Sequence, residues 1–378
     1  MNIGVFETIH FEGAYPIIKL FDNGKNKITV FTYENCFHQF KFLFAHDLVK
    51  YEWLIKNEAA NKNAFIYKIL SEVKKRKIEL LYLNTVSNNY HSYSLLIKIL
   101  KGVRVIITLH SINSYFIPPP AWSIKKIIRS NGKKWLIKSA NEFNVVGLDM
   151  TDILRAKIPL HKKIHCLPGA VFEKEKISTK RNLEKKEIKI VVPGSVDIRR
   201  RNYEQVFDLL KKINASNLPV TVTILGGAYF AEGKQVIQRC KEYAKQYDNL
   251  KYYDTEVVDQ PEFDRIMNAS HFVWSPLLQQ TFLEDGIMEE YGSTVCSGNI
   301  FDIIKHAVPF IIPRKLRTDK FLESSAFRYE TVDNIINYLK SFLVYPQLYL
   351  DLQNKAIENS NNYTIECIRD RNPGVFRI

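Results

Sequence analysis

Apolar runs rich in β-branched residues alternate along the chain with segments in which apolar residues recur at helical spacing. This alternation is typical of parallel sheets covered by helices, so the predicted fold class is α/β. For the first half we expect strands at 2–6, 27–32, 78–84, 103–110, 143–147 and 163–167, and helices at 15–21, 63–75, 92–101, 124–138 and 151–156.

A second series of the same kind follows a charged stretch, Glu173 to Glu187, whose low apolar content predicts a surface linker. A chain of 378 residues is too long for one ordinary core, so we expect two domains, 1–182 and 183–378. The second series predicts strands at 188–192, 220–225, 250–253, 271–275 and 308–312, and helices at 203–213, 234–247, 261–268, 299–305, 331–342 and 348–360.

The cysteines and the apolar runs bear on the compartment. The five cysteines are scattered and form no CxxC pair, which argues against a disulfide framework and against a zinc site. The first residues lack the pattern of a signal peptide, and no stretch of about eighteen apolar residues occurs. We therefore expect a cytoplasmic protein in a reducing compartment.

The net charge of +14 is unevenly distributed. The first 182 residues hold 29 of the 54 Lys and Arg residues but only 14 of the 40 Asp and Glu residues. A basic field attracts anionic phospholipid, nucleic acid or phosphorylated substrates, although a solvated lysine-rich surface is the simpler alternative.

One basic segment is also rich in large apolar residues. Ala121 to Lys138 interleaves Trp, Ile and Leu with five lysines and one arginine, which suits a segment at a membrane surface. Two short helices packed on the core with a basic outer face are the alternative. The first interpretation predicts a peripheral protein on the inner face of the cell membrane, bound to anionic lipid.

Loops that follow strands are where such sheets bind ligands. In YGSTVCSGNIFD, Ser297, Gly298 and Asn299 stand where a helix begins, so free backbone N–H groups could hold a diphosphate. Asp302 falls one turn inside that helix and could accept hydrogen bonds from ribose hydroxyls. A simple helix cap is the alternative interpretation.

A second candidate loop, PGSVDIRRRNYE, carries three arginines just before an amphipathic helix. Among these, Arg200 and Arg201 could bind phosphate in a bidentate manner or neutralise a diphosphate leaving group. A solvated basic turn explains the same pattern.

Two places in the first half could supply a general base. The loop TIHFEGAYP flanks Gly13, where a backbone could approach a ligand closely, with His10 and Glu12. His110 stands at the carboxyl end of the strand VRVIITLHS, where it would face a cleft. A turn glycine and a structural histidine are the alternatives, and Gly13 forms no GxGxxG pattern.

The order of these segments resembles the GT-B glycosyltransferases over essentially the whole chain. It is most similar to the family 4-like group of bacterial polysaccharide and lipid-linked oligosaccharide transferases. The motifs that carry the resemblance are IITLHS, NVVGLDMTDILRAK, IHCLPGAVF, VVPGSVDIRRRNYEQVFDLL, VTILGGAYF and LKYYDTEVVDQPEFDRIMNASHFVWSPL.

The resemblance implies two Rossmann-like domains facing each other across a cleft. The second domain would bind a nucleotide-sugar, with the base near Thr255, Glu256 and Val257, and Gly194 in the turn before the basic loop. The first domain would bind the acceptor, and the final helix would cross back onto it. No DxD-like pair follows a suitable strand, so we expect no cofactor and a reaction that is independent of metal.

The sequence departs from the family pattern at two places. Where the family has two glutamates eight positions apart, Thr294 aligns with the first and Asp302 with the second. Glu290, or its neighbour Glu289, could substitute for the first. Arg201 best matches the family lysine of the basic loop.

These features predict a glycosyltransferase that moves a sugar from a nucleotide-sugar to a saccharide or lipid-linked acceptor in cell-surface glycan biosynthesis. A nucleotide-sugar 2-epimerase of the same fold is one alternative. A basic nucleic-acid-binding protein is the other, but an RNP motif or helix-turn-helix is not evident.

Overall fold

The computed structural model describes residues 1–57, 61–120, 123–177, 183 and 187–376. Its contacts divide the chain into two compact units. Unit 1 comprises Met1–Ala170, Phe282–Cys296 and Ile365–Ile378, and unit 2 comprises Val171–Thr281 and Ser297–Thr364. Residues 178–182 and 184–186 of the expected linker lie outside the described residues.

Unit 1 is built on a seven-stranded parallel sheet in the order β3-β2-β1-β4-β5-β6-β7. The strands are β1 (Asn2–Phe6), β2 (Lys27–Tyr33), β3 (Glu52–Lys56), β4 (Leu80–Leu83), β5 (Arg104–Leu109), β6 (Glu142–Val145) and β7 (Lys163–Cys166). Most side chains of the central strands β1, β4 and β5 are buried, which explains the continuous apolar runs that predicted them.

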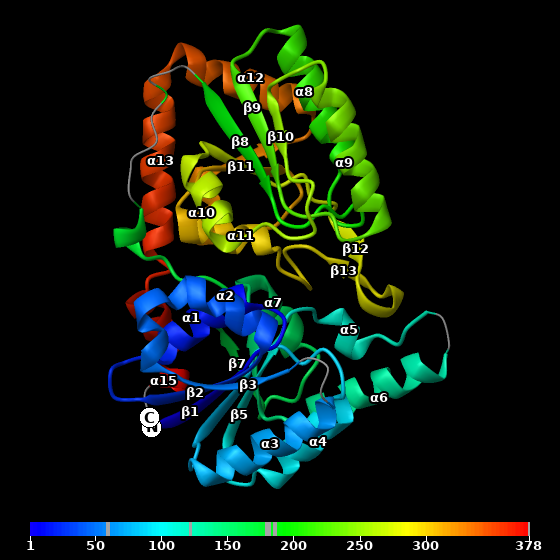
Figure 1. Ribbon diagram of the computed structural model, residues 1–378, viewed down its shortest axis with the longest axis vertical. Coiled ribbons are helices and arrows are strands. Elements are labelled where there is room, and N and C mark those ends of the chain that lie inside the picture. Colours follow the sequence, from blue (N-terminus) through cyan, green and yellow to red (C-terminus); the bar gives the residue numbers. More distant parts are fainter. Residues whose placement is uncertain (58–60, 121–122, 178–182, 184–186, 377–378) are drawn as a thin grey trace. The chain divides into compact units, whose positions relative to one another are not determined.

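Helices cover both faces of this sheet, with α1, α2 and α14 packed together on one side and α3, α4 and α6 on the other (Figure 1). The helices of unit 1 are α1 (Phe11–Phe21), α2 (Glu34–Phe44), α3 (Lys62–Lys75), α4 (Tyr90–Ile99), α5 (Asn113–Phe116), α6 (Ile124–Ser139), α7 (Leu148–Arg155), α14 (Ile365–Arg371) and α15 (Pro373–Phe376), with a 3-10 helix η1 at Ala45–Lys50.

Unit 2 contains a six-stranded parallel sheet in the order β10-β9-β8-β11-β14-β15. Its strands are β8 (Ile188–Pro193), β9 (Val220–Leu225), β10 (Leu250–Tyr252), β11 (Phe272–Trp274), β14 (Phe310–Pro313) and β15 (Ala326–Tyr329). The short strands β12 (Gln280–Phe282) and β13 (Met288–Glu290) pair with each other, and β13 belongs to unit 1.

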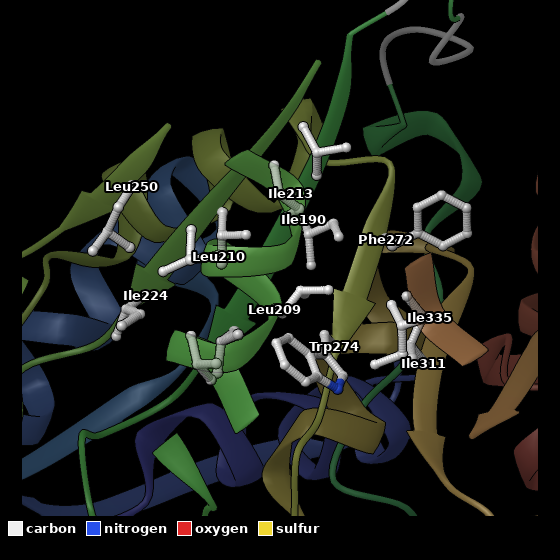
Figure 2. Close-up of a cluster of buried hydrophobic side chains, with 14 of the residues drawn as sticks. Ile190, Leu209, Leu210, Ile213, Ile224, Leu250, Phe272, Trp274, Ile311 and Ile335 are labelled. Carbon is white, nitrogen blue, oxygen red and sulfur yellow. The ribbon is translucent and has the colours of Figure 1, made fainter. Parts of the chain in front are cut away.

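The helices of unit 2 pack their apolar faces on this sheet, and Figure 2 shows the core where α8 and α12 meet the strands. Leu209, Leu210 and Ile213 of α8 belong to this core together with Trp274 of β11, and all four side chains are fully buried. The helices are α8 (Tyr203–Ala215), α9 (Ala231–Ala244), α10 (Gln260–Ala269), α11 (Gly298–His306), α12 (Val332–Val344) and α13 (Pro346–Asn361), with 3-10 helices η2 (Lys174–Lys176) and η4 (Lys320–Ser325). The 3-10 helix η3 (Glu284–Gly286) belongs to unit 1.

Two Rossmann-like parallel sheets confirm the predicted α/β fold class, and each predicted strand and helix is present within a few residues. The helices α2, α5, α14 and α15 and the strands β3, β12, β13 and β15 were not predicted. The helix predicted to end the chain is α13, which belongs to unit 2, whereas α14 and α15 pack on unit 1. Arg369 of α14 donates to the carbonyl oxygens of Leu20 and Asp22.

Candidate functional site

Gly194 follows β8 and lies against the guanidinium of Arg201. Its φ is +92°, and a Cβ atom added here would lie 2.5 Å from Nη2 of Arg201. Any side chain would therefore both strain the backbone and displace the guanidinium. The turn after β8 is shaped around this arginine.

Arg201 is a buried cation whose guanidinium donates hydrogen bonds to neutral groups of the described residues. The residue is 6% exposed, and its guanidinium donates to the carbonyl oxygens of Pro193 (2.7 Å) and Ser195 (2.9 Å) and to Oδ1 of Asn299 (2.7 Å). Its Nε has no hydrogen-bond partner, and no described carboxylate lies within ion-pair distance. Burying a charge without a counter-ion is costly, so the arrangement favours an anionic ligand.

The two preceding arginines differ from Arg201 because each of them pairs with a buried carboxylate, Asp197. Arg199 donates two hydrogen bonds to Asp197 (2.9 and 2.7 Å) and lies 4.3 Å from the ring centre of Phe230. Arg200 reaches the same carboxylate at 3.5 Å. Burial alone would raise the pKa of Asp197, but the hydrogen bonds from Arg199 hold it below its ordinary value.

Helix α11 begins beside Arg201 and presents its N-terminus there. Ser297 is the N-cap and its hydroxyl accepts from the N–H of Asn299 at 3.3 Å. The side chain of Asn299 is buried, donates to Pro193 O at 3.0 Å and so ties α11 to the end of β8. Gly298 is exposed, and a Cβ atom there would meet nothing within 4 Å.

The positive end of α11 and the Arg201 guanidinium therefore lie close together, because Arg201 donates to Asn299 of this helix. That they hold a diphosphate stays a prediction. Asp302 is partly exposed and lies one turn into α11. Its proposed contact with ribose is not tested by the geometry.

Thr255, Glu256 and Val257 form an exposed turn after β10. A Cβ atom on Gly227 would lie 2.0 Å from Glu256 O, so the turn after β9 packs directly against this backbone. Ala228 N donates to Thr255 O at 3.0 Å. The three predicted base-binding residues are therefore held at the same sheet edge as Gly194.

In unit 1, the first strand leads into a buried carboxylate that the sequence analysis missed. Glu7 is fully buried, and its Oε1 accepts from the backbone N–H groups of Thr8, Ile9 and His10 at 2.6–2.9 Å. Its Oε2 accepts from Asn84 Nδ2 (2.6 Å) and Thr85 Oγ1 (2.7 Å). Glu7 therefore fixes the loop after β1 to the loop after β4.

His110, at the end of β5, lies beside this network. Its Nε2 is 2.8 Å from Asn84 O and 3.1 Å from Thr85 Oγ1. Because a carbonyl oxygen only accepts, Nε2 carries the proton and Nδ1 is left as an acceptor. Burial, reinforced by the nearby His10, lowers the pKa of His110 to about 4, so the ring is neutral at pH 7.

His10 and Glu12 are exposed neighbours of His110. The rings of His10 and His110 are 5.4 Å apart, and His10 Nδ1 lies 3.5 Å from Glu12 Oε1. Gly13 is not in a loop as expected, because α1 begins at Phe11 and places it in the first turn. A Cβ atom on Gly13 would make an ordinary 3.6 Å contact with Asn84 Nδ2, so no described protein atom requires glycine here, and a close approach of a ligand to Gly13 stays a prediction.

Glu290 and Thr294, which we expected to contact the donor, belong to the segment Phe282–Cys296 of unit 1. Thr294 Oγ1 accepts from Glu290 N at 2.8 Å. The adjacent Glu289 is fully buried and caps α5 by accepting from the N–H groups of Asn113 (3.2 Å) and Ser114 (2.8 Å). Burial raises the pKa of Glu289, whose carboxylate is committed to this cap.

The described residues contain no group of three or more His, Cys, Asp or Glu side chains placed to hold a metal ion. Reaction without a metal remains a prediction. Within the described ranges, no helix is long and apolar enough to cross a membrane.

Comparisons with known proteins place the chain by its fold alone. No family model and no curated protein matches its sequence. Among solved structures, sucrose-phosphate synthase from Thermosynechococcus elongatus matches with a TM-score of 0.65 at 12% identity, over 100% of this chain and 98% of that one.

Two further structures contained ligands. Anabaena HepE in complex with UDP and glucose matches with a TM-score of 0.66 at 12% identity, over 100% of this chain and 99% of that chain. UDP-GlcNAc 2-epimerase from Neisseria meningitidis, bound to UDP-GlcNAc, matches with a TM-score of 0.58 at 12% identity, over 98% and 100%. The chain thus has the GT-B fold of two Rossmann-like domains, which both transferases and epimerases adopt.

Proposed function

We propose that the protein is a glycosyltransferase that moves a sugar from a nucleotide-sugar to a saccharide or lipid-linked acceptor in cell-surface polysaccharide biosynthesis. The observation that carries the proposal is the buried Arg201 guanidinium, which lacks a described carboxylate partner and lies at the start of α11. Similarity in fold to HepE, which was crystallised with UDP and glucose, supports a nucleotide-sugar as the donor.

In this proposal unit 2 binds the donor. The start of α11 at Ser297, Gly298 and Asn299 holds the diphosphate through the positive end of the helix and the N–H group of Gly298. Arg201 balances the charge that grows on the diphosphate as the glycosidic bond breaks. A helix N-terminus and a fixed cation together provide this stabilisation, so we propose that the reaction does not need a metal ion.

The remaining donor contacts follow from position. Asp302 accepts from the ribose hydroxyls, and the turn Thr255–Val257 lies against the base. Gly194 keeps the approach to the diphosphate open, and Arg200 adds positive charge near it. Glu290 and Thr294 remain proposed donor contacts on the strength of the family resemblance alone.

Unit 1 binds the acceptor and supplies a base. His110 is neutral at pH 7 and has its Nδ1 available, so it can accept a proton from an acceptor hydroxyl. The His10 and Glu12 pair is the second candidate base. Glu7 acts through these groups as a positioning residue, because it fixes both loops that surround the imidazole of His110.

A nucleotide-sugar 2-epimerase is the second candidate, since an enzyme of that activity shares the fold. The basic excess of the first 182 residues favours the transferase, because an epimerase has no need of a separate anionic acceptor. We propose a location on the cytoplasmic face of the cell membrane.

Incubation with radiolabelled UDP-, GDP-, CMP- and dTDP-sugars separates these activities. A transferase releases the nucleotide and passes the sugar to an acceptor or, slowly, to water. An epimerase returns a nucleotide-sugar with an inverted carbon, and a nucleic-acid-binding protein leaves every donor unchanged while retaining polynucleotide.

A further inference from the structure

We propose that one face of unit 1, formed by α4 and α6, docks on a lipid bilayer that contains anionic phospholipid. The apolar members of this α4–α6 face are Leu95 and Ile99 of α4 and Ile124, Ile128 and Trp135 of α6. This inference rests on the surface of unit 1 and does not depend on the proposed transfer reaction.

Helix α6 has apolar side chains on its solvent side. Ile124 is 78% exposed, Ile128 54% and Trp135 56%. These positions are four and seven residues apart and therefore share one side of a helix. The opposite side of α6, which includes Leu136 and Ile137, is buried in unit 1. A helix that only covers a core would have polar residues where these three lie.

Helix α4 continues the same surface. Leu95 is 53% exposed and Ile99 42%, and they lie one turn apart on α4. Trp135 joins the two helices, because its ring is 5.1 Å from the ring of His91 and 5.8 Å from Nζ of Lys98. The five apolar side chains therefore belong to one surface carried by two packed helices (Figure 1).

The charges around these side chains determine what the surface can contact. Lys98, Lys125, Lys134 and Lys138 are exposed, and neither α4 nor α6 contains an aspartate or a glutamate. A second copy of the same face would place lysines against lysines. Anionic headgroups complement the lysines, while Ile and Trp side chains enter the boundary between headgroups and acyl chains. A lipid surface satisfies both requirements at once.

Not every lysine of the segment contributes. Lys133 is 2% exposed and lies between the rings of Tyr90 and Tyr115, each 5.5 Å from its Nζ. Lys126 donates to Asp285 O. Lys133 is therefore unavailable to lipid, and Lys126 is partly buried and bonded to Asp285. Two residues of the predicted segment, 121 and 122, lie outside the described residues.

The face is presented by a firmly anchored helix. Arg129 pairs with Asp285 at 3.1 Å near the start of α6. At the end of the helix the buried Lys162 donates to the carbonyl oxygens of Ile137, Lys138 and Ala140. Because α6 is ordered before it meets a membrane, docking does not require a helix to fold at the surface.

The test is co-sedimentation of the full chain with vesicles of phosphatidylcholine alone or mixed with phosphatidylglycerol, at low and high salt. One variant is Ile124→Glu with Ile128→Glu. The matched control is Val49→Glu with Leu160→Glu, two residues of unit 1 that are 89% and 87% exposed and lie outside α4 and α6. Circular dichroism confirms that both variants are folded.

We expect wild type and control to bind mixed vesicles and not to bind vesicles of pure phosphatidylcholine. Both should be released by 1 M salt, where charges are screened beyond about 3 Å. The Ile124/Ile128 variant should bind at least tenfold more weakly. A second variant, Lys134→Gln with Lys138→Gln, should lower partitioning roughly fivefold per lysine.

Three results would overturn the proposal. The first is that wild type does not bind mixed vesicles at low salt. The second is that the Ile124/Ile128 variant binds as well as the control. The third is a wild-type dimer in sedimentation velocity that the Ile124/Ile128 variant loses, without vesicle binding, which would assign the face to a second copy of the chain.

Discussion

Replacing Arg201 with methionine removes the guanidinium charge and leaves an unbranched side chain that can occupy the same space. Three hydrogen bonds are lost, those to Pro193 O, Ser195 O and Asn299 Oδ1. The variant also no longer has to keep a cation out of water, which favours folding. Asn299 Nδ2 still donates to Pro193 O. Exchanging a buried charge for an apolar group is often close to neutral, so we expect unfolding free energy to change by less than about 2 kcal/mol.

Binding of a nucleoside diphosphate should respond much more strongly. An anion at the first N–H groups of α11 would lie on the order of 7 Å from the guanidinium, which gives about 2 kcal/mol per unit charge at an effective dielectric of 20. Arg201→Met should therefore weaken binding at least roughly 30-fold. The variant would be folded and deficient in binding.

The assay is calorimetric titration with UDP, or with whichever of GDP, ADP and dTDP raises the melting temperature of wild type. Arg199→Met is the matched control, because Asp197 already neutralises that neighbouring arginine. We expect the control to stay within about threefold of wild type, since an exposed, paired charge contributes little. Equal losses in the two variants, or unchanged affinity in Arg201→Met, would refute the reasoning.

Other predictions follow from single side chains. Asp302→Ala should weaken binding of a nucleoside diphosphate at least tenfold in calorimetry and leave that of inorganic pyrophosphate unchanged, because the ribose contact is removed while the proposed diphosphate contacts remain; equal loss of both would contradict the ribose assignment. Glu7→Gln should lower the free energy of unfolding in urea by about 1–3 kcal/mol, because the NH2 group of the new amide would face N–H donors. An unchanged midpoint of the urea transition would contradict the positioning role of Glu7. Burial would raise the pKa of Glu142, but hydrogen bonds from His165 and Arg104 lower it to about 2. Because the pKa is lower in the folded state than its ordinary value of 4.5, the ionised Glu142 stabilises the fold by on the order of 3 kcal/mol above pH 4.5. This stabilisation is lost as the pH falls from 4.5 toward 2. Glu142→Gln should therefore make the unfolding free energy depend less on pH in this range.

The fold was predictable from the sequence because the central strands are buried on both faces and therefore consist of continuous apolar runs. Helix Glu34–Phe44 was missed because its sequence, ENCFHQFKFLF, is rich in aromatic residues that favour helix only weakly. The strand Glu52–Lys56 lies at an edge of the sheet and is mostly half-buried, so its pattern is weak.

The site was predictable only where its residues are neighbours in sequence. Ser297, Gly298 and Asn299 carry the signature of a helix start, and α11 begins at Gly298. The pattern of three arginines could not show which one remains without a carboxylate. The partner of Arg201 is Asn299, which lies almost a hundred residues away in the sequence.

Contacts between residues that are far apart in the chain could not be predicted from the sequence. Glu289 caps a helix 175 residues earlier in the chain, so the assignment of Phe282–Cys296 to unit 1 follows from tertiary contacts alone. Glu7 could have been found, since it directly follows the first strand and thus stands at the edge where parallel sheets bind ligands.

Hydrogen–deuterium exchange of the full chain, with and without a saturating nucleoside diphosphate from the thermal screen, tests the central claim most directly. We predict that exchange slows in two segments, 194–201 and 297–302, because the ligand orders the turn after β8 and the start of α11. The exposed turn 255–257 should be protected by the nucleoside diphosphate and not by pyrophosphate. Protection confined to other segments, or none with any of the diphosphates, would contradict the assignment of this site to a nucleotide-sugar.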